Sequence, residues 1–129
     1  MGEEQTDISD TEAKALHEVE LCLEWLQRAH GHLVQFHHAT GHAIDHLDDG
    51  ESLLREVGHE ELADAVRDEY LPRGVIDDRW TYDLLETYER GFLDDFKSFE
   101  RRTRDEIADG RRHVMERRLE EDWTDRAEE

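Results

Sequence analysis

The chain has 129 residues, which suits one domain, and it carries 36 acidic against 16 basic residues for a formal net charge of −20 at pH 7. Only 36% of the residues are hydrophobic, and no apolar run approaches the ~20 residues of a membrane-spanning helix. So negative a chain repels phosphate, which argues against a nucleic-acid partner. The single cysteine, Cys22, excludes an intrachain disulfide, and a start without signal-peptide features favours a cytoplasmic location.

The charge composition is typical of a protein that works in concentrated salt. Lys14 and Lys97 are the only lysines, while aspartate and glutamate are abundant. In molar salt the Debye length is about 3 Å, so the repulsion among carboxylates is screened. We therefore expect the fold to weaken in dilute salt. The alternative interpretation is an acidic face for a basic protein partner.

The first long pattern predicts one helix from about Thr11 to Val57. Residues 1–9 are polar and acidic, which predicts a flexible tail, and Ser9 can cap the helix with Glu12 in its first turn. Residues that alternate in steps of three and four form a seam for lengthwise helix packing. The seam consists of Leu16, Val19, Leu23, Leu26, His30, Leu33, His37, Thr40, Ile44, Leu47 and Leu54.

A second set of residues widens the apolar arc of this helix to about half its circumference, enough to contact two neighbouring helices. The set consists of Cys22, Trp25, Ala29, Phe36 and Ala43. Its position near the seam predicts a buried, unreactive thiol at Cys22.

The second half of the chain predicts a short helix and then another long one. Gly58 favours a helix stop, residues 59–70 form a short amphipathic segment with Leu62, Ala63 and Val66 inward, and Pro72 ends it. Asp77 or Asp78 then caps a helix that we expect to continue to about Trp123. Its inner row reads Trp80, Leu84, Leu85, Tyr88, Phe92, Phe96, Phe99, Thr103, Ile107, Gly110 and Val114.

These elements predict an all-α fold: a long antiparallel hairpin with a short connecting helix, in a single helical domain over residues 10–125, with residues 126–129 frayed. The arginines of residues 101–118 would then lie beside the acidic residues 3–24. A homodimeric four-helix bundle would cover the wide apolar arc. Folding back at Gly31, Gly41 or Gly50 is the alternative.

Six of the nine histidines lie between Gln27 and Asp49. His30 and His37 fall on the seam, where buried imidazoles need hydrogen-bond partners. A simple hairpin alignment places residue 37 near residue 97, and Glu89 and Glu100 lie at the edge of the facing row. His38, His42 and His46 form a row at intervals of four on the opposite face.

Two interpretations of the histidines remain open. The seam pair could be a polar layer that fixes helix register. Alternatively, His30, His37 and Glu100 could hold a divalent metal ion, since two imidazoles and a carboxylate are common ligands. The outer row offers His38 and His42 as a weaker metal pair, because spacing of four places both rings on one side of a helix. No other cofactor is indicated.

The segments FHHATGHAIDHLDD and LPRGVIDDRWTYDLLE resemble small helical proteins of halophilic archaea, over roughly residues 15–123. The resemblance implies a halophilic source and a helical fold, and it implies no activity. The sequence contains no Gly-rich phosphate loop and no Gly-x-Ser-x-Gly motif, so it does not indicate an enzyme. Two functions remain: a homodimeric structural module that binds a protein partner, and a metal-binding helical bundle.

Overall fold

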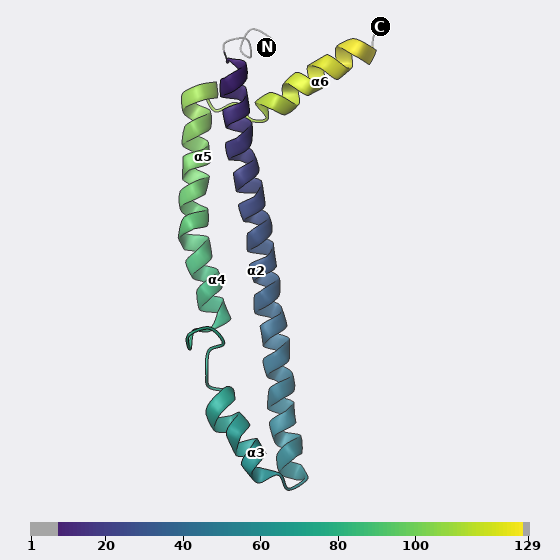
Figure 1. Ribbon diagram of the computed structural model, residues 1–129, viewed down its shortest axis with the longest axis vertical. Coiled ribbons are helices and arrows are strands. Elements are labelled where there is room, and N and C mark those ends of the chain that lie inside the picture. Colours follow the sequence, from purple (N-terminus) through teal and green to yellow (C-terminus); the bar gives the residue numbers. More distant parts are fainter. Residues whose placement is uncertain (1–7, 128–129) are drawn as a thin grey trace. The chain divides into compact units, whose positions relative to one another are not determined.

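The computed structural model describes residues 8–127, which are almost entirely helical (Figure 1). The elements are α2 (Asp10–Glu56), α3 (Glu60–Ala65), the π-helical turn η1 (Val66–Tyr70), α4 (Thr81–Arg90), α5 (Phe92–Ala108) and α6 (Val114–Ala127). Within this described range no strand forms, and only an isolated bridge joins Ile76 and Arg79. The predicted all-α class is confirmed. None of the described helices is both long enough and apolar enough to cross a membrane.

The chain divides into two compact units, which are described one at a time. The terminal unit consists of residues 8–27 and 91–127, and the central unit consists of residues 28–90. Helix α2 contributes its first turns to the terminal unit and the rest to the central unit.

The ends of α2 follow from local sequence. The Ser9 hydroxyl accepts a hydrogen bond from the Glu12 backbone N–H at 3.1 Å, and the Glu12 carboxylate accepts one from the Ser9 N–H at 3.0 Å. This reciprocal capping box satisfies two of the N–H groups at the helix start. At the other end Gly58 has a φ of +92°, a left-handed conformation that glycine adopts without strain. The predicted start and stop are confirmed.

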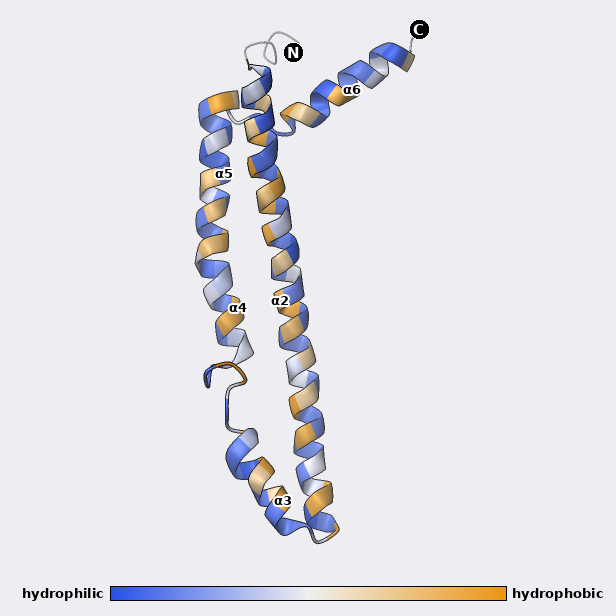
Figure 2. Cartoon of the chain, viewed as in Figure 1, coloured by the Kyte–Doolittle hydropathy of each residue, from blue (hydrophilic) through white to orange (hydrophobic). Residues whose placement is uncertain are grey.

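The predicted seam on α2 is confirmed, but the prediction that a second set of apolar residues widens the buried arc is wrong. All eleven seam residues are buried or half-buried. The five residues of this second set, Cys22 included, are exposed. Figure 2 shows hydrophobic residues spaced along α2 with hydrophilic ones between them. The neighbouring helices cover only the narrow seam, so the Cys22 thiol is not buried.

The predicted second long helix is wrong, because three helices replace it. Gly91 separates α4 from α5, and residues 109–113 separate α5 from α6. Asp109 and Gly110 have φ values of +51° and +81°, and the Gly110 N–H donates to the Arg104 carbonyl at 3.0 Å. A left-handed residue with such a backward hydrogen bond terminates a helix.

The predicted caps for this helix, Asp77 and Asp78, instead build the loop before it. Both residues have positive φ, and α4 begins at Thr81. The Asp78 carboxylate accepts a hydrogen bond from the Gly74 N–H at 2.9 Å. A Cβ at Gly74 would lie 2.4 Å from the Arg79 backbone, so the tight loop requires glycine. Trp80, which we expected to pack, is 39% exposed.

The apolar core of the terminal unit joins the start of α2 to the end of α5 and the start of α6. It consists of Ile8, Ala13, Leu16, Ala108 and Val114, with Ile107 and Met115 packed against it. Residues 1–7 of the predicted tail and residues 128–129 of the predicted frayed end lie outside the described range. Ile8, within the predicted tail, is only 4% exposed. The Arg118 guanidinium holds this end, donating to the Ile8 carbonyl at 2.7 Å.

The central unit has a smaller core. Ala63 and Val66 are buried there as predicted, but Leu62 is 57% exposed. The Arg55 side chain connects α2 to α3 through the Asp64 carboxylate at 3.0 Å. His30 meets Glu89 and His37 meets Thr81, so α4 runs antiparallel to this part of α2.

Candidate metal centre

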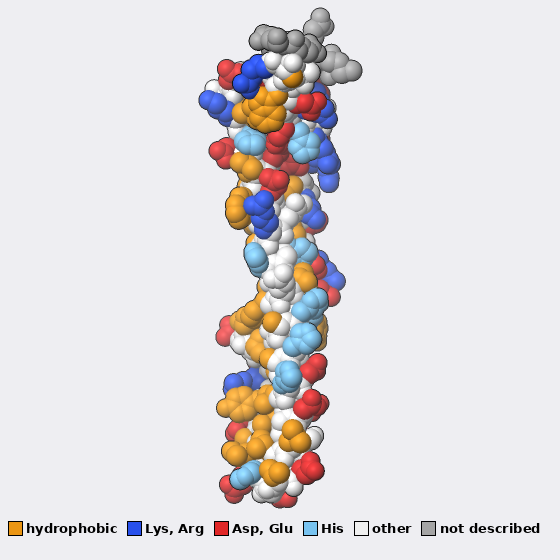
Figure 3. Space-filling view, turned by 90° about the vertical axis from the view of Figure 1, so that its right-hand side faces the viewer, with side chains coloured by type: hydrophobic (Ala, Val, Ile, Leu, Met, Phe, Trp, Pro, Cys, Tyr) orange, Lys and Arg blue, Asp and Glu red, His pale blue; other side chains and the backbone are white. Residues whose placement is uncertain are grey.

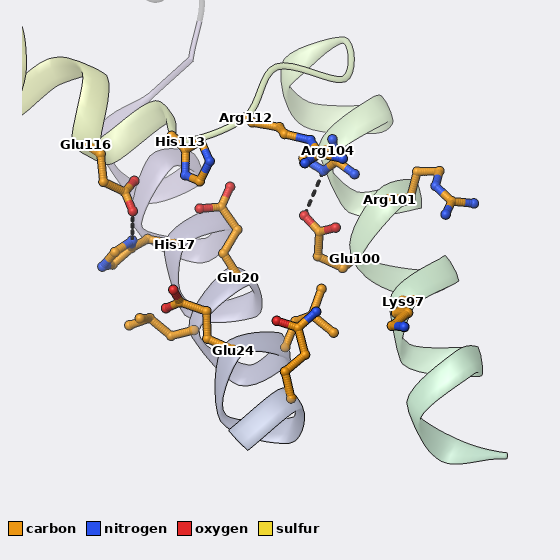
Figure 4. Close-up of a pocket in the computed structure, with 13 residues that line it drawn as sticks. His17, Glu20, Glu24, Lys97, Glu100, Arg101, Arg104, Arg112, His113 and Glu116 are labelled. Atoms are coloured by element: carbon orange, nitrogen blue, oxygen red, sulfur yellow. Dashed lines mark hydrogen bonds and ion pairs between the residues drawn. The ribbon is translucent and has the colours of Figure 1, made fainter. Parts of the chain in front are cut away.

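Three side chains of the terminal unit converge with the ligand types and spacing of a metal site. His17 and Glu20 come from α2, and Glu116 comes from α6. Each side chain offers one ligand atom, and these atoms all lie within 4.8 Å of one another. His17 and Glu20 are three residues apart and therefore share a face of the helix. Figure 4 shows them with Glu116, which approaches from the neighbouring helix.

Two atoms of this cluster are buried without a hydrogen bond. Within the described chain, His17 Nδ1 and Glu20 Oε1 have no hydrogen-bond partner. A buried polar atom without a partner destabilises a fold, and native proteins rarely leave one unsatisfied. His17 Nδ1 also lies 3.7 Å from Glu116 Oε2, beyond hydrogen-bond distance. The cluster therefore has the lone pairs to accept a cation.

The raised pKa of the Glu20 carboxyl also indicates a position where a cation would be favourable. Burial raises the pKa of the Glu20 carboxyl, and the nearby Glu116 and Glu100 carboxylates raise it further. The charge and backbone N–H of His113 lower it, without cancelling the increase. A raised pKa means that the ionised carboxylate is unfavourable in this place. A bound cation would remove that cost.

One separation within the cluster is close to that between two ligands of a small divalent ion. Zn²⁺ binds histidine nitrogen and carboxylate oxygen at about 2.1 Å, so two ligands of a tetrahedral ion lie roughly 3.4 Å apart. The 3.7 Å between His17 Nδ1 and Glu116 Oε2 is close to that value. Glu116 is exposed, so its side chain can rotate to close the remaining gap. Three protein ligands leave one coordination position open, as in catalytic zinc sites.

The histidines predicted from the seam lie in the central unit, where each already has a partner. His30 Nε2 lies 2.7 Å from a Glu89 carboxylate oxygen, and its ring stacks on Tyr88 with the centroids 5.8 Å apart. Glu89 was one of the partners expected for this pair. His37 Nδ1 lies 2.6 Å from the Thr81 hydroxyl. The expected alignment of residue 37 with residue 97 did not anticipate Thr81.

Glu100, the third predicted ligand, belongs to the terminal unit. Its carboxylate accepts a hydrogen bond from Arg104 Nε at 2.7 Å, and the two side chains are only 8% and 10% exposed. Arg104 also donates to the Gly110 carbonyl at 3.3 Å. The set His30, His37 and Glu100 stays a prediction. So does the outer pair, His38 and His42, which is exposed on α2 as expected.

The sequence does contain a signal for the observed cluster. The pattern His-x-x-Glu occurs at residues 17–20 and again at residues 113–116. The motif of diiron bundles runs in the opposite order, Glu-x-x-His, and the many acidic residues conceal any single pair. The second pattern also approaches the first only because the chain turns at residues 109–113, which helical periodicity did not predict.

No family model, no curated protein and no solved structure matches this chain.

Proposed function

We propose that this protein is a metal-binding helical protein whose terminal unit holds a divalent transition-metal ion with His17, Glu20 and Glu116. The observation that carries the proposal is the meeting of three potential ligand atoms within 4.8 Å, together with two buried atoms that have no hydrogen-bond partner in the described chain. One imidazole and two carboxylates form a mixed nitrogen and oxygen set that suits Zn²⁺ or Mn²⁺.

The contrast with the central-unit histidines supports this choice of ligands. His30 and His37 would have to break hydrogen bonds of 2.7 Å and 2.6 Å before they could bind an ion through the same nitrogens. His17 Nδ1 and Glu20 Oε1 break none. The cost of preparing the ligands is therefore lower in the terminal unit.

The test is a metal titration of protein purified in molar KCl without chelator. We expect one Zn²⁺ or Co²⁺ per chain by equilibrium dialysis and metal analysis. His17→Ala and Glu116→Gln should each weaken the affinity by more than about 100-fold, because loss of a direct ligand exceeds the effect of an outer-shell change.

Two controls separate this site from other metal binding. Glu121→Gln removes an exposed carboxylate from the same helix α6, and His30→Ala removes the imidazole paired with Glu89. Neither should change the affinity. Stoichiometric binding that survives His17→Ala, or that depends on His30, would contradict the proposed ligands.

Exposed apolar side chains favour a second function, self-association into a helical bundle that serves as an interaction module. Fourteen large hydrophobic residues of the described chain are at least 39% exposed. In the central unit Leu53, Val57 and Leu62 are 60%, 70% and 57% exposed. Figure 3 shows hydrophobic side chains open to solvent on the face that it presents. Such surfaces are typical of association sites, and a second copy offers a matching apolar surface.

Light scattering in molar KCl tests this function. We expect twice the mass of one chain for the native protein and a lower mass for Leu53→Glu. Ser52→Glu is the matched control, because it adds the same charge at the neighbouring exposed position. A native protein with the mass of a single chain would rule out the homodimer.

A further inference from the structure

The cluster of His17, Glu20 and Glu116 lines a pocket that also has a basic wall. The pocket lies within the terminal unit and has a volume of about 370 Å³. This volume falls in the range of about 300–1,000 Å³ that is common for small-molecule sites. The basic residues that line it are Lys97, Arg101, Arg104 and Arg112. In Figure 4, Arg112 extends from the turn before α6 toward Arg104 on α5.

The charge balance of this pocket differs from that of the whole chain. Its lining has four lysine or arginine residues and four glutamates, Glu20, Glu24, Glu100 and Glu116. The pocket is therefore formally neutral in a chain of net charge −20. A divalent cation bound to the cluster would leave the pocket with two uncompensated positive charges. A ligand with two negative charges would restore neutrality.

Not all of the basic side chains are equally available to a ligand. Arg104 is engaged by the Glu100 carboxylate at 2.7 Å and by the Gly110 carbonyl at 3.3 Å. Arg101 turns away from the cluster in Figure 4. Lys97 and Arg112 are exposed, and neither forms a side-chain ion pair within residues 8–127. Arg112 can therefore pair with a ligand without losing a charged partner, whereas Lys97 lies across the pocket from the cluster in Figure 4.

We propose that the metal-loaded pocket binds a small dianionic oxyanion of the phosphate class, with one oxygen in the open coordination position of the ion and another paired with Arg112. The inference rests on the proposed metal function. Arginine presents a planar set of donors that matches phosphate geometry. Metal ions with an open position bind and orient such oxygens in phosphoryl-transfer and hydrolytic sites.

The test uses Co²⁺ as the bound ion and inorganic phosphate as the probe. The visible absorption of Co²⁺ reports its coordination, so binding of the metal and of the anion is read in one cuvette. We expect a cobalt spectrum on metal addition and a saturable change of that spectrum on phosphate addition. Arg112→Gln should leave the cobalt affinity unchanged and raise the phosphate Kd about tenfold, the loss expected for one charged hydrogen bond.

Arg102→Gln is the matched control, because Arg102 is exposed on α5, pairs with Glu106 and does not line the pocket. It should leave the phosphate Kd unchanged. Acetate, with one negative charge, should bind more weakly than phosphate, and equal affinity overturns the charge argument.

The other outcomes separate the two proposals. A cobalt spectrum that phosphate does not change overturns the oxyanion inference and leaves the metal function intact. Phosphate binding of equal strength without cobalt also overturns the inference. Failure of the chain to bind cobalt at all overturns the metal function and the inference together.

Discussion

The two units of this protein use the same residue types in opposite ways. In the central unit His30 is paired with Glu89 at 2.7 Å and His37 with Thr81 at 2.6 Å. In the terminal unit His17 Nδ1 and Glu20 Oε1 are buried, and neither has a hydrogen-bond partner among the described residues. Satisfied polar pairs stabilise a helix contact, whereas unsatisfied ones that converge leave lone pairs for a ligand. A histidine on a helix seam is therefore not by itself a sign of a metal site.

The units also differ in the amount of apolar burial. The terminal unit has a cluster that includes Leu16 and Val114, at 1% and 2% exposure. The buried hydrophobic residues of the central unit are Ala63 and Val66, at 0% and 8% exposure. Hydrophobic stabilisation scales with the apolar area removed from water. We therefore expect substitutions in the terminal unit to have the larger effects on stability.

The largest difference in the free energy of unfolding between the two units should come from two ion pairs, each of which links neighbouring turns of one helix. Glu100→Ala leaves the Arg104 guanidinium buried without its partner, and we expect a loss of about 3 kcal/mol in the free energy of unfolding. Glu51→Ala removes a more exposed partner of Arg55, and less than about 1 kcal/mol should be lost. Urea denaturation in molar KCl measures both. Equal losses would show that burial does not distinguish the two pairs.

Replacing a buried leucine and an exposed leucine by alanine should give nearly as large a difference in stability between the two units. Leu16→Ala removes a side chain that is 1% exposed, and we expect a cost of about 2–4 kcal/mol. Leu53→Ala removes the same atoms from a position that is 60% exposed, where about 0.5 kcal/mol is expected for a chain that has not self-associated. Thermal and urea unfolding followed by circular dichroism would compare them. If Leu53→Ala is as destabilising as Leu16→Ala, the proposed self-association covers Leu53.

The two histidine environments predict a smaller difference in metal-free protein. His30→Ala loses the hydrogen bond to Glu89 and the stacking on Tyr88, for about 1 kcal/mol. His17→Ala removes an unsatisfied buried nitrogen, so its effect on unfolding should be close to zero. The measurement is urea unfolding in the presence of a chelator. A large loss in His17→Ala would indicate a structural role for His17 in place of a ligand role.

The smallest effect on stability should come from Glu20→Gln. We expect this substitution to stabilise the metal-free protein. The folded-state pKa of Glu20 is raised by burial and by the neighbouring carboxylates, so its ionised form weakens folding at neutral pH. That cost disappears as the pH falls below the unfolded-state pKa. Glu20→Gln should therefore raise the Tm of metal-free protein at pH 7 and leave it unchanged in acid.

Glu24→Gln is the control for this measurement, because Glu24 lines the same pocket but is exposed. It should not change the Tm at either pH. Added Zn²⁺ should raise the Tm of the native chain and not that of Glu20→Gln. A lower Tm of metal-free Glu20→Gln at pH 7 would show that the charge and backbone N–H of His113 outweigh the cost of burying the Glu20 carboxylate.

Local sequence determined the helical class, both ends of α2 and the seam along it. Ser9 and Glu12 form a capping box, Gly58 accepts a left-handed turn, and the alternating apolar residues face the neighbouring helix. These features depend on residues within a few positions of one another, so the pattern predicts them. The polar partner of His30 could also be predicted from the sequence, since Glu89 lies at the edge of the facing row.

The break in the second helix and the acidic residues that meet His17 depend on contacts between residues far apart in the sequence. The turn at residues 109–113 directs α6 so that Glu116 approaches His17, although the two lie far apart in sequence. Likewise Glu100, which looked like a ligand in the sequence, lies buried beside Arg104. In a chain with 36 acidic residues, many carboxylates lie at a sequence position that could place them beside a histidine as metal ligands. Only the packing of the helices selects which of them lose their water and face an imidazole.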